Sequence, residues 1–492
     1  MTILRDCLLA AVKDLPGTRQ FHIHVLVSAP RRTSSLYIFA KPLPRIYLQD
    51  ILVLCAEQAN PDAPRIMVTA IEASVYHVPS TSSLVLYIGK VDSTGQGSQP
   101  SPTVALVRAL LAYYANPLTR PIPAKHLWIH LFARAQGQYL FPNSSEFAGK
   151  RPLSDIKLCA WWKRVLSDVA RETQSKVAAL NLYHLFPGYT ETEASNALKY
   201  ASKSSSGDVT WTYGHPYSQT DIPLPCPRSR EGQNLGWFIP SFDDDPKSRF
   251  LDDIAYNTEG EIKSPVRKRA RRDSNEGKEK EDKGGKNDAP LGELNKVSAD
   301  EFWERMSFRQ ECVSGAITGF FAVGIKSVED GEMATAALGP GLVSPQMIKR
   351  VLASLTTGVE FSTAERAARA TETLESTIKR LCEGIGAVHT PIVSGGRAAT
   401  ERQTPEREQG PPAPPSTPPR PRPGAQRAAT EEGSPGGAPE PELETTLETY
   451  SQYIFGTVAG SGVSSGGGVG AGPGGAGAVR VLTARRKQRR GR

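Results

Sequence analysis

The chain has 492 residues, with 59 Lys and Arg against 51 Asp and Glu and a formal net charge of +8. Residues 383–492 contain 21 Gly and 14 Pro, so they are predicted to form a tail without regular structure. The positive charge is also local, because residues 263–286 have a net charge of +5 and residues 480–492 contain seven basic residues and no acid. The rest of the foldable chain is neutral, which excludes a body whose whole surface binds nucleic acid.

Cysteine spacing and hydropathy exclude further classes. The six cysteines form no Cys-x-x-Cys pair and have no histidine at zinc spacing, so neither a disulfide framework nor a metal site is expected. Arg5 and Asp6 stand where a signal peptide would begin its apolar run, and the most apolar stretch, 315–325, is too short for a bilayer. We therefore expect an intracellular, soluble protein. The basic run 265–272 favours nuclear import, with a solvated loop as the alternative.

The body is predicted to interleave strands and helices. Hydrophobic periodicity predicts, in chain order, a helix at 2–14, strands at 21–28, 35–39, 65–75 and 83–88, a helix at 103–115, a strand at 126–132, and helices at 153–172, 302–324 and 347–382, the last of them single or paired. This order predicts an α/β or α+β fold with one central mixed β-sheet flanked by helices.

The predicted organisation has three parts. Residues 1–326 are expected to form the main domain, interrupted by a disordered basic insert at 258–297. Residues 327–382 are expected to form a helical extension, and residues 383–492 the Pro/Gly-rich tail with its basic end.

The first candidate site follows the strand that begins at Ser83. Small and polar residues at 89–95 lead from this strand toward the helix that begins at Thr103. Free N–H groups and hydroxyls between a strand and a helix N-terminus can bind phosphate oxygens. The loop has neither a GxGxxG nor a P-loop motif, so an ordinary connection is the alternative.

Aromatic residues mark two more candidates. The loop after residue 132 carries Arg134, Gln136 and Tyr139, which could hold a phosphate and line an apolar channel. Trp161 and Trp162 point about 100° apart on a helix, so one is expected in the core and the other along a groove. The alternative for both candidates is ordinary packing.

The fourth candidate is the acidic segment 243–245, which aromatic residues precede and Lys247 follows. A carboxylate beside aromatic side chains can accept a proton from an amine, and Lys247 or Arg249 could hold the carboxylates in place. The alternative is an acidic N-cap for a helix that begins at Pro246.

Together, residues 138–142, the Trp161–Trp162 pair, residues 243–251 and residues 302–321 resemble the fungal histone acetyltransferases of the regulator-of-Ty-transposition family, which are related to the CBP-type enzymes. The resemblance covers about residues 1–326. It implies a CBP-type histone acetyltransferase fold and acetyl-CoA as the cofactor. The third acid, Asp243, and the long tail depart from the family pattern.

The resemblance also implies roles for individual residues. Those expected beside acetyl-CoA are Val91, Asp92, Ser93, Phe132, Gln136, Arg151, Pro152, Leu153 and Trp161. Those expected to take part in catalysis are Tyr139, Trp162, Asp244 and Asp245, with Asp245 as the proton acceptor and Asp244 as its orienter. Lys247 matches a lysine that family members acetylate on themselves, and no metal is implied.

The substrate and partners are implied in the same way. The resemblance implies transfer to histone H3 in H3–H4, mainly at the core lysine at position fifty-six and secondarily at tail lysines. It implies stimulation by an anti-silencing-function chaperone and a nucleosome-assembly-type chaperone, in the nucleus, during replication-coupled nucleosome assembly and DNA-damage tolerance. Neither sequence-specific DNA binding nor a membrane is implied. The alternatives are a non-enzymatic chromatin adaptor and another CoA- or nucleotide-dependent transferase.

Overall fold

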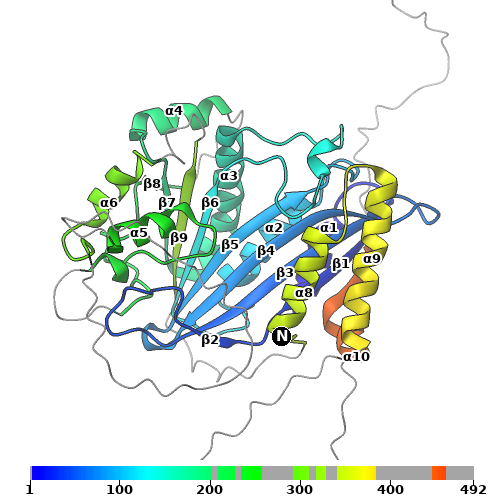
Figure 1. Ribbon diagram of the computed structural model, residues 1–492, viewed down its shortest axis with the longest axis horizontal. Helices are drawn as coiled ribbons and strands as arrows, with labels where there is room; N and C mark the ends of the chain where they lie inside the picture. Colours follow the sequence, from blue (N-terminus) through cyan, green and yellow to red (C-terminus); the bar gives the residue numbers. More distant parts are fainter. Residues whose placement is uncertain are drawn as a thin grey trace, which may run out of the picture.

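A ten-stranded mixed sheet forms the centre of the computed structural model, which describes residues 3–201, 209–227, 234–256, 292–309, 317–328, 341–383 and 446–460. Along the sheet the order is β10-β1-β3-β4-β5-β6-β9-β7-β8, with β2 beside β3 (Figure 1). The strands are β1 (Gln20–Val27), β2 (Arg31–Thr33), β3 (Ile46–Gln58), β4 (Ile66–Val78), β5 (Ser83–Ser93), β6 (His126–Ala133), β7 (Val177–Leu185), β8 (Trp211–Tyr213), β9 (Gly319–Ser327) and β10 (Phe455–Ala459). The pairs β5–β6 and β7–β8 are parallel, and the other neighbours are antiparallel.

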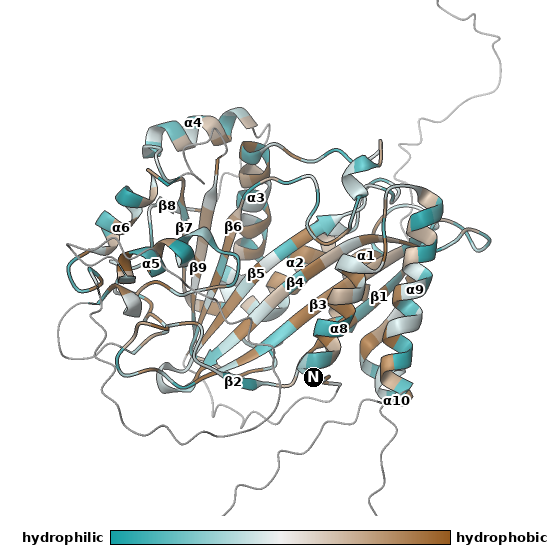
Figure 2. Ribbon diagram, viewed as in Figure 1, coloured by the Kyte–Doolittle hydropathy of each residue, from teal (hydrophilic) through white to brown (hydrophobic). Residues whose placement is uncertain are grey.

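Helices cover both faces of this sheet. The principal helices are α1 (Leu4–Lys13), α2 (Thr103–Ala115), α3 (Asp155–Thr173), α4 (Glu191–Ala201), α5 (Pro246–Tyr256), α6 (Ala299–Met306), α8 (Pro345–Thr357) and α9 (Ala364–Glu383). One hydrophobic core joins α1 to α4 to the sheet, and others join α8 and α9, or α5 and α6, to its opposite face. Hydrophobic residues concentrate on the strands, whereas α4 and α9 carry many polar residues (Figure 2).

The β5–α2–β6 unit sets the position of the site described below. Along β5, Leu84 and Leu86 enter the core under α2, while Val85 and Tyr87 enter the core on the other face. Helix α2 connects two parallel strands, so its N-terminus and the carboxyl ends of β5 and β6 lie at one edge of the sheet.

The predicted fold class is confirmed, and most predicted elements are present. The helices predicted at 2–14, 103–115 and 153–172 correspond to α1, α2 and α3, and the region 347–382 forms the pair α8 and α9. The strands predicted at 21–28, 65–75, 83–88 and 126–132 correspond to β1, β4, β5 and β6.

Two differences concern the first half of the chain. Residues 35–39 form a turn rather than a strand, because Leu36 and Tyr37 both enter the core there and the Leu36 carbonyl accepts the N–H of Ser241. Strand β3 is absent from the predicted elements, although its apolar run from Ile51 to Ala56 is typical of a strand buried on both faces.

The helix predicted at 302–324 is wrong in its second half. Residues 302–306 belong to helix α6, as predicted. Residues 319–324, in contrast, belong to strand β9, which lies between β6 and β7 in the sheet. Strand β9 is buried on both faces, so its run of apolar residues lacks the alternation that distinguishes a strand from a buried helix.

Residues 446–460 differ from the tail expected at 383–492. They form a short helical turn followed by β10, which pairs with Gln20–His24 of β1. Ile454 is buried in the core under α8 and α9, and the Phe455 ring lies 4.9 Å from the ring of His24. Most of the predicted insert at 258–297 and of the tail, including 265–272 and 480–492, lies outside the described residues. In the described part of the chain, no helix is both long and apolar enough to cross a membrane.

Candidate functional site

A cavity of about 410 Å³ opens at the carboxyl ends of β5 and β6. Its volume is in the range of small-molecule and cofactor sites. The residues that the sequence placed beside a cofactor or in an acyl channel line this one cavity, namely Val91, Asp92, Ser93, Phe132, Gln136, Tyr139, Arg151, Pro152, Leu153, Trp161 and Trp162. The three separate sequence candidates before residue 200 therefore form a single site.

The N-terminus of helix α2 faces this cavity. Thr103 and Val104 of α2 line it, whereas α3 lines it with one side of the helix, through Leu158, Trp161 and Trp162. Thr103 Oγ1 lies 2.9 Å from Ser101 Oγ and 2.8 Å from Thr69 Oγ1, which fixes the start of α2. Free N–H groups and the dipole of α2 favour an anionic ligand near Thr103.

Cationic side chains add to this preference. Lys90, Arg134, Lys150 and Arg151 all line the cavity. Lys90 and Lys150 are not among the residues predicted individually from the sequence, although Lys90 lies in the segment 89–95 and Lys150 precedes Arg151 directly. The described cavity is thus suited to phosphate groups by both backbone and side-chain charge.

Gly95 allows two loops to meet at the cavity wall. Its φ is +74°, and a Cβ there would come within 2.5 Å of the Lys150 Cα. A side chain at this position would therefore push the loop 94–101 away from the loop that carries Lys150.

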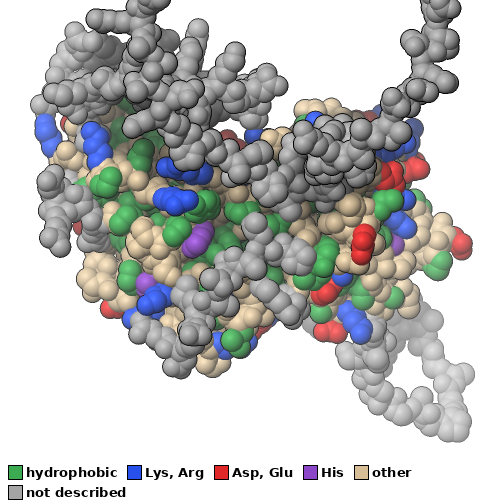
Figure 3. Space-filling model, turned by 90° about the horizontal axis from the view of Figure 1, so that it is seen from below, with side chains coloured by type: hydrophobic (Ala, Val, Ile, Leu, Met, Phe, Trp, Pro, Cys, Tyr) green, Lys and Arg blue, Asp and Glu red, His purple; other side chains and the backbone are tan. Residues whose placement is uncertain are grey.

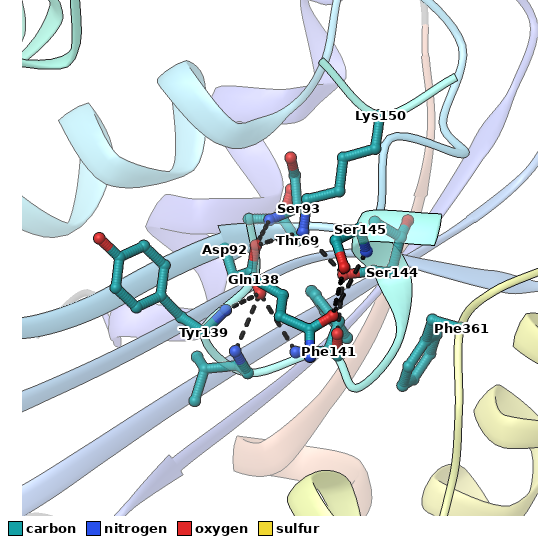
Figure 4. A network of polar contacts seen from close by, with 12 residues as sticks. Thr69, Asp92, Ser93, Gln138, Tyr139, Phe141, Ser144, Ser145, Lys150 and Phe361 are labelled. Carbon is teal, nitrogen blue, oxygen red and sulfur yellow. Dashed lines mark hydrogen bonds and ion pairs between the residues drawn. The ribbon is translucent and has the colours of Figure 1, made fainter. Parts of the chain in front are cut away.

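Asp92 organises the loop that follows β6 (Figure 4). Its carboxylate accepts the backbone N–H groups of residues 139, 140 and 141, at 2.7, 2.9 and 3.1 Å, and also that of Ser93 at 2.8 Å. The Lys150 ammonium donates to the same carboxylate at 2.9 Å. Asp92 is only 6% exposed. Its carboxylate is therefore occupied by protein donors and shielded from solvent, although the residue borders the cavity.

Aromatic side chains form another part of the cavity wall. The rings of Trp161 and Trp162 meet edge to face, with centroids 4.7 Å apart, and both line the cavity. The Tyr139 hydroxyl donates to the Arg134 carbonyl oxygen. Burial, with the nearby charge of Asp92, raises the pKa of Tyr139 to about 12, so this hydroxyl is protonated at neutral pH.

Asp245 and Lys247 form a buried pair outside this cavity. Asp245 is 1% exposed, and one carboxylate oxygen accepts the Lys247 N–H at 3.0 Å, as the predicted N-cap of α5 would. The Lys247 ammonium forms an ion pair with the other oxygen and lies 4.5 Å from the centre of the Phe242 ring. Burial lowers the pKa of Lys247, against the opposing effect of Asp245.

Asp244, in contrast, lies beside the rim of the cavity. It has a φ of +60°, a left-handed conformation that Asp tolerates, and its side chain is exposed. Its carboxylate lies 3.6 Å from the ammonium of the cavity residue Lys90, which also forms a 3.0 Å ion pair with Glu72. The structure thus brings Asp244, but not Asp245, next to the lining residues.

Lys247 borders a second, much smaller cavity of about 20 Å³. His130, Tyr217, Trp303 and Phe320 also line it. Burial, with the positive charge of Lys247, lowers the pKa of His130 to about 3, so the imidazole is neutral. No sequence signal singled out His130, because its neighbours come from distant segments.

The charged side chains on one face of the molecule are scattered. Figure 3 shows that the Lys and Arg side chains described on this face do not form one continuous area. No group of three or more potential metal ligands occurs in the described ranges.

The fold and cavity define the class of protein. It is an α/β protein with a cavity at the carboxyl ends of two parallel strands, lined by the start of α2, by basic side chains and by three aromatic residues. Residues 112–377 match the family model described as a histone acetyltransferase KAT11-type domain. This match covers more than half of the sequence, and the chain belongs to the histone acetyltransferase KAT11-type family.

Individual relatives agree with this assignment and with the resemblance stated above, which is confirmed. The chain is 32% identical over 286 residues to histone acetyltransferase rtt109 of Aspergillus flavus, a match that covers 53% of this chain and 45% of that protein. It is 24% identical over 272 residues to histone acetyltransferase rtt109 of Schizosaccharomyces pombe, covering 54% and 59% respectively. The chain thus spans about half the length of these relatives.

A solved structure shares the fold. The crystal structure of Rtt109 from Aspergillus fumigatus matches with a TM-score of 0.58 and 24% sequence identity. The match covers 76% of this chain and 96% of that one.

Proposed function

We propose that this protein is an acetyl-CoA-dependent lysine acetyltransferase that acts on histones. The observation that carries the proposal is one cavity whose wall combines the N-terminus of α2 and basic side chains with the aromatic residues Tyr139, Trp161 and Trp162. Membership of the KAT11-type family and the names of the two relatives support the same reaction and the histone substrate.

The cavity residues fit acetyl-CoA. The phosphates would lie against the α2 N-terminus, the backbone at Val91 and Ser93, and Arg151. Gly97 lets the loop 94–101 pack closely against β4, because a Cβ there would come within 2.9 Å of Val68 Cγ1. The residues that would border the rest of the cofactor are Phe132, Gln136, Pro152, Leu153 and Trp161.

When bound, acetyl-CoA supplies the acetyl thioester. The protein then has to present a neutral lysine amine and exclude water. Tyr139 and Trp162 would surround the amine with apolar surface, which lowers the pKa of a lysine by disfavouring its charged form. A nearby carboxylate would take the amine proton.

The pair Asp244 and Asp245 is the proposed proton acceptor. The sequence favours Asp245 with Asp244 as its orienter, but the carboxylate of Asp245 already holds the α5 N-terminus and Lys247. The position of Asp244 beside Lys90 supports it as the acceptor for a histone lysine. Asp245 is then the acceptor for Lys247, which we propose is itself acetylated.

Radiolabelled acetyl transfer tests the reaction. We expect the full chain to transfer acetyl groups to H3–H4 and to bind acetyl-CoA. Histone binding without consumption of acetyl-CoA would support the adaptor alternative, and a preference for small amines would support another transferase.

Variants of the two aspartates test their roles. We expect Asp244→Asn to lose most transfer to histone while unfolding normally, and Asp245→Asn to lose stability and the acetylation of Lys247. Mass spectrometry of the purified chain measures the latter. Near-normal transfer by Asp244→Asn would return the assignment to Asp245.

The finer substrate and partners are part of the proposal. We propose that the main target is the histone H3 lysine at position fifty-six, with tail lysines as further targets, and that an anti-silencing-function chaperone and a nucleosome-assembly-type chaperone present it in the nucleus. Residues 480–492 are basic and are joined to β10 by the Gly-rich residues 461–479, so they can engage an acidic chaperone–histone complex while the cavity stays accessible. We expect their deletion to weaken chaperone-dependent transfer more than basal transfer. Equal loss of both activities argues against this role.

A further inference from the structure

A third buried ion pair lies behind the cavity wall. The Arg19 guanidinium and the Glu57 carboxylate are 3.1 Å apart, and each side chain is only 4% exposed. Arg19 directly precedes β1, and Glu57 is near the end of the neighbouring strand β3. Buried charges require several hydrogen bonds to be tolerated, so their partners indicate what the pair does.

Those partners are backbone groups of a single loop. Arg19 donates to the carbonyl oxygens of Ser98 and Pro100, both at 2.6 Å. Glu57 accepts the N–H of Ser98 at 2.9 Å. The pair therefore fixes three backbone groups of residues 98–100 through charge-assisted hydrogen bonds, which are stronger than neutral ones.

This loop is a wall of the cofactor cavity. Gly95, Gly97, Gln99 and Ser101 line the cavity, and the loop ends at the N-terminus of α2. It also lies directly on the ion pair, because a Cβ at Gly97 would come within 3.1 Å of a Glu57 carboxylate oxygen.

The orientation of the carbonyl groups matters for an anionic ligand. Arg19 does not line the cavity, so the Ser98 and Pro100 oxygens that it binds are directed toward the protein interior. Without the guanidinium these oxygens could rotate toward the cavity, where they would repel phosphate and disturb the start of α2.

We propose that Arg19 and Glu57 are positioning residues that hold the loop 94–101 in its acetyl-CoA-binding conformation. This inference rests on the proposed function. It predicts an effect on the affinity for the cofactor, and no effect on the histone site or on the transfer step.

Steady-state kinetics with both substrates varied, together with calorimetric titration of CoA, test the proposal. Arg19→Lys keeps the charge but loses the two-armed donor geometry, so we expect the KM for acetyl-CoA and the Kd for CoA to rise about tenfold. Glu57→Gln keeps an acceptor for Ser98 and removes the charge, so we expect a smaller rise of about threefold. For both variants kcat and the KM for histone should change less than twofold.

Asp50→Asn is the matched control. It removes the ion pair between Arg31 and Asp50, which also involves β3 but lies near the start of that strand and makes no contact with the loop 94–101. We expect Asp50→Asn to leave the KM for acetyl-CoA unchanged, even where it lowers the unfolding temperature as much as Glu57→Gln does.

Two results would overturn the inference. One is an unchanged Kd for CoA in a folded Arg19→Lys or Glu57→Gln variant, and the other is a parallel change of kcat and of the KM for histone. If the unaltered chain binds CoA but transfers no acetyl group to histone, the proposed function fails while the positioning role is still measured by the Kd. If Arg19→Lys does not fold, the milder Glu57→Gln variant decides.

Discussion

Among the residues that the structure describes, two lysine–aspartate pairs are buried, and their surroundings differ. Lys150 and Asp92 lie at the proposed cofactor cavity, where the carboxylate accepts four backbone N–H groups and the ammonium also donates to Ser144 Oγ at 2.7 Å. Lys247 and Asp245 lie at the N-terminus of α5, where the carboxylate accepts the Lys247 N–H and the ammonium faces an aromatic ring. The same type of ion pair therefore holds a loop in place at the cavity and keeps a lysine amine away from water at the start of α5.

Replacing Asp92 should have the largest effect. Asp92→Ala would leave four backbone donors and the buried Lys150 without their acceptor, so we expect a loss of about 5 kcal/mol of stability or more and about a hundredfold weaker CoA binding. Denaturant unfolding and calorimetry measure the two effects. An Asp92→Ala variant that still binds CoA normally would show that the loop at 139–141 keeps its shape without the carboxylate.

Breaking the second pair should have the next largest effect. Asp245→Leu leaves Lys247 buried without a partner, so we expect a loss of about 3–5 kcal/mol of stability. Adding Lys247→Met removes the uncompensated charge and should restore most of that loss. Urea unfolding of both single variants and the double variant forms a thermodynamic cycle, and simple additivity would contradict direct coupling of the two residues.

His130 borders the same small cavity as Lys247, and its protonation should make the stability of the folded protein depend on pH. Its pKa is about 3 in the folded protein, against a usual value of 6.5, because burial and Lys247 disfavour its charged form. The unfolded chain thus binds a proton more readily, and stability is lost as the pH falls below 6.5 toward 3. At pH 5 this amounts to about 2 kcal/mol. We expect His130→Gln to reduce the pH dependence of unfolding between pH 7 and 5 by that amount, and an unchanged slope would assign the dependence to other groups.

Lys90 should have the smallest effect, because its ion pairs with Glu72 and Asp244 are about one-third exposed on the lysine side. We expect Lys90→Met to change stability by less than about 1 kcal/mol at low salt, and by less still at high salt. Thermal unfolding at two salt concentrations measures this. A large loss of stability that does not change with salt would show that the ion pairs of Lys90 behave like the buried ion pairs.

Local sequence patterns could predict the cavity wall but not its internal bonding. The strand before Gly89, the helix after Pro102 and the tryptophan pair each follow from periodicity and turn chemistry, and they line one cavity. That Asp92 would bond to residues 139–141 could not be predicted, because these residues meet only when β5 and β6 pair.

The acidic segment shows the same limit. The N-cap at Asp245 was foreseeable from the Pro246 that follows it, and the structure has it. The proposed difference in role between Asp244 and Asp245 depends on the left-handed backbone conformation of Asp244 and on the position of Lys90. Both are tertiary features. Strand β9 was mistaken for helix for a related reason, since burial on both faces removes the alternation.

Strand β10 has a consequence for the synthesis of this protein. Strand β1 ends at Val27, but β10, which covers its free edge, is made only when residue 459 has been added. At about 5–20 residues per second this edge stays open for roughly 20–90 s. An open edge strand is a template for pairing with other chains. Chains that end between α9 and β10 would therefore have a permanently exposed β1 edge. We expect these truncated chains to aggregate more during expression than chains that include β10.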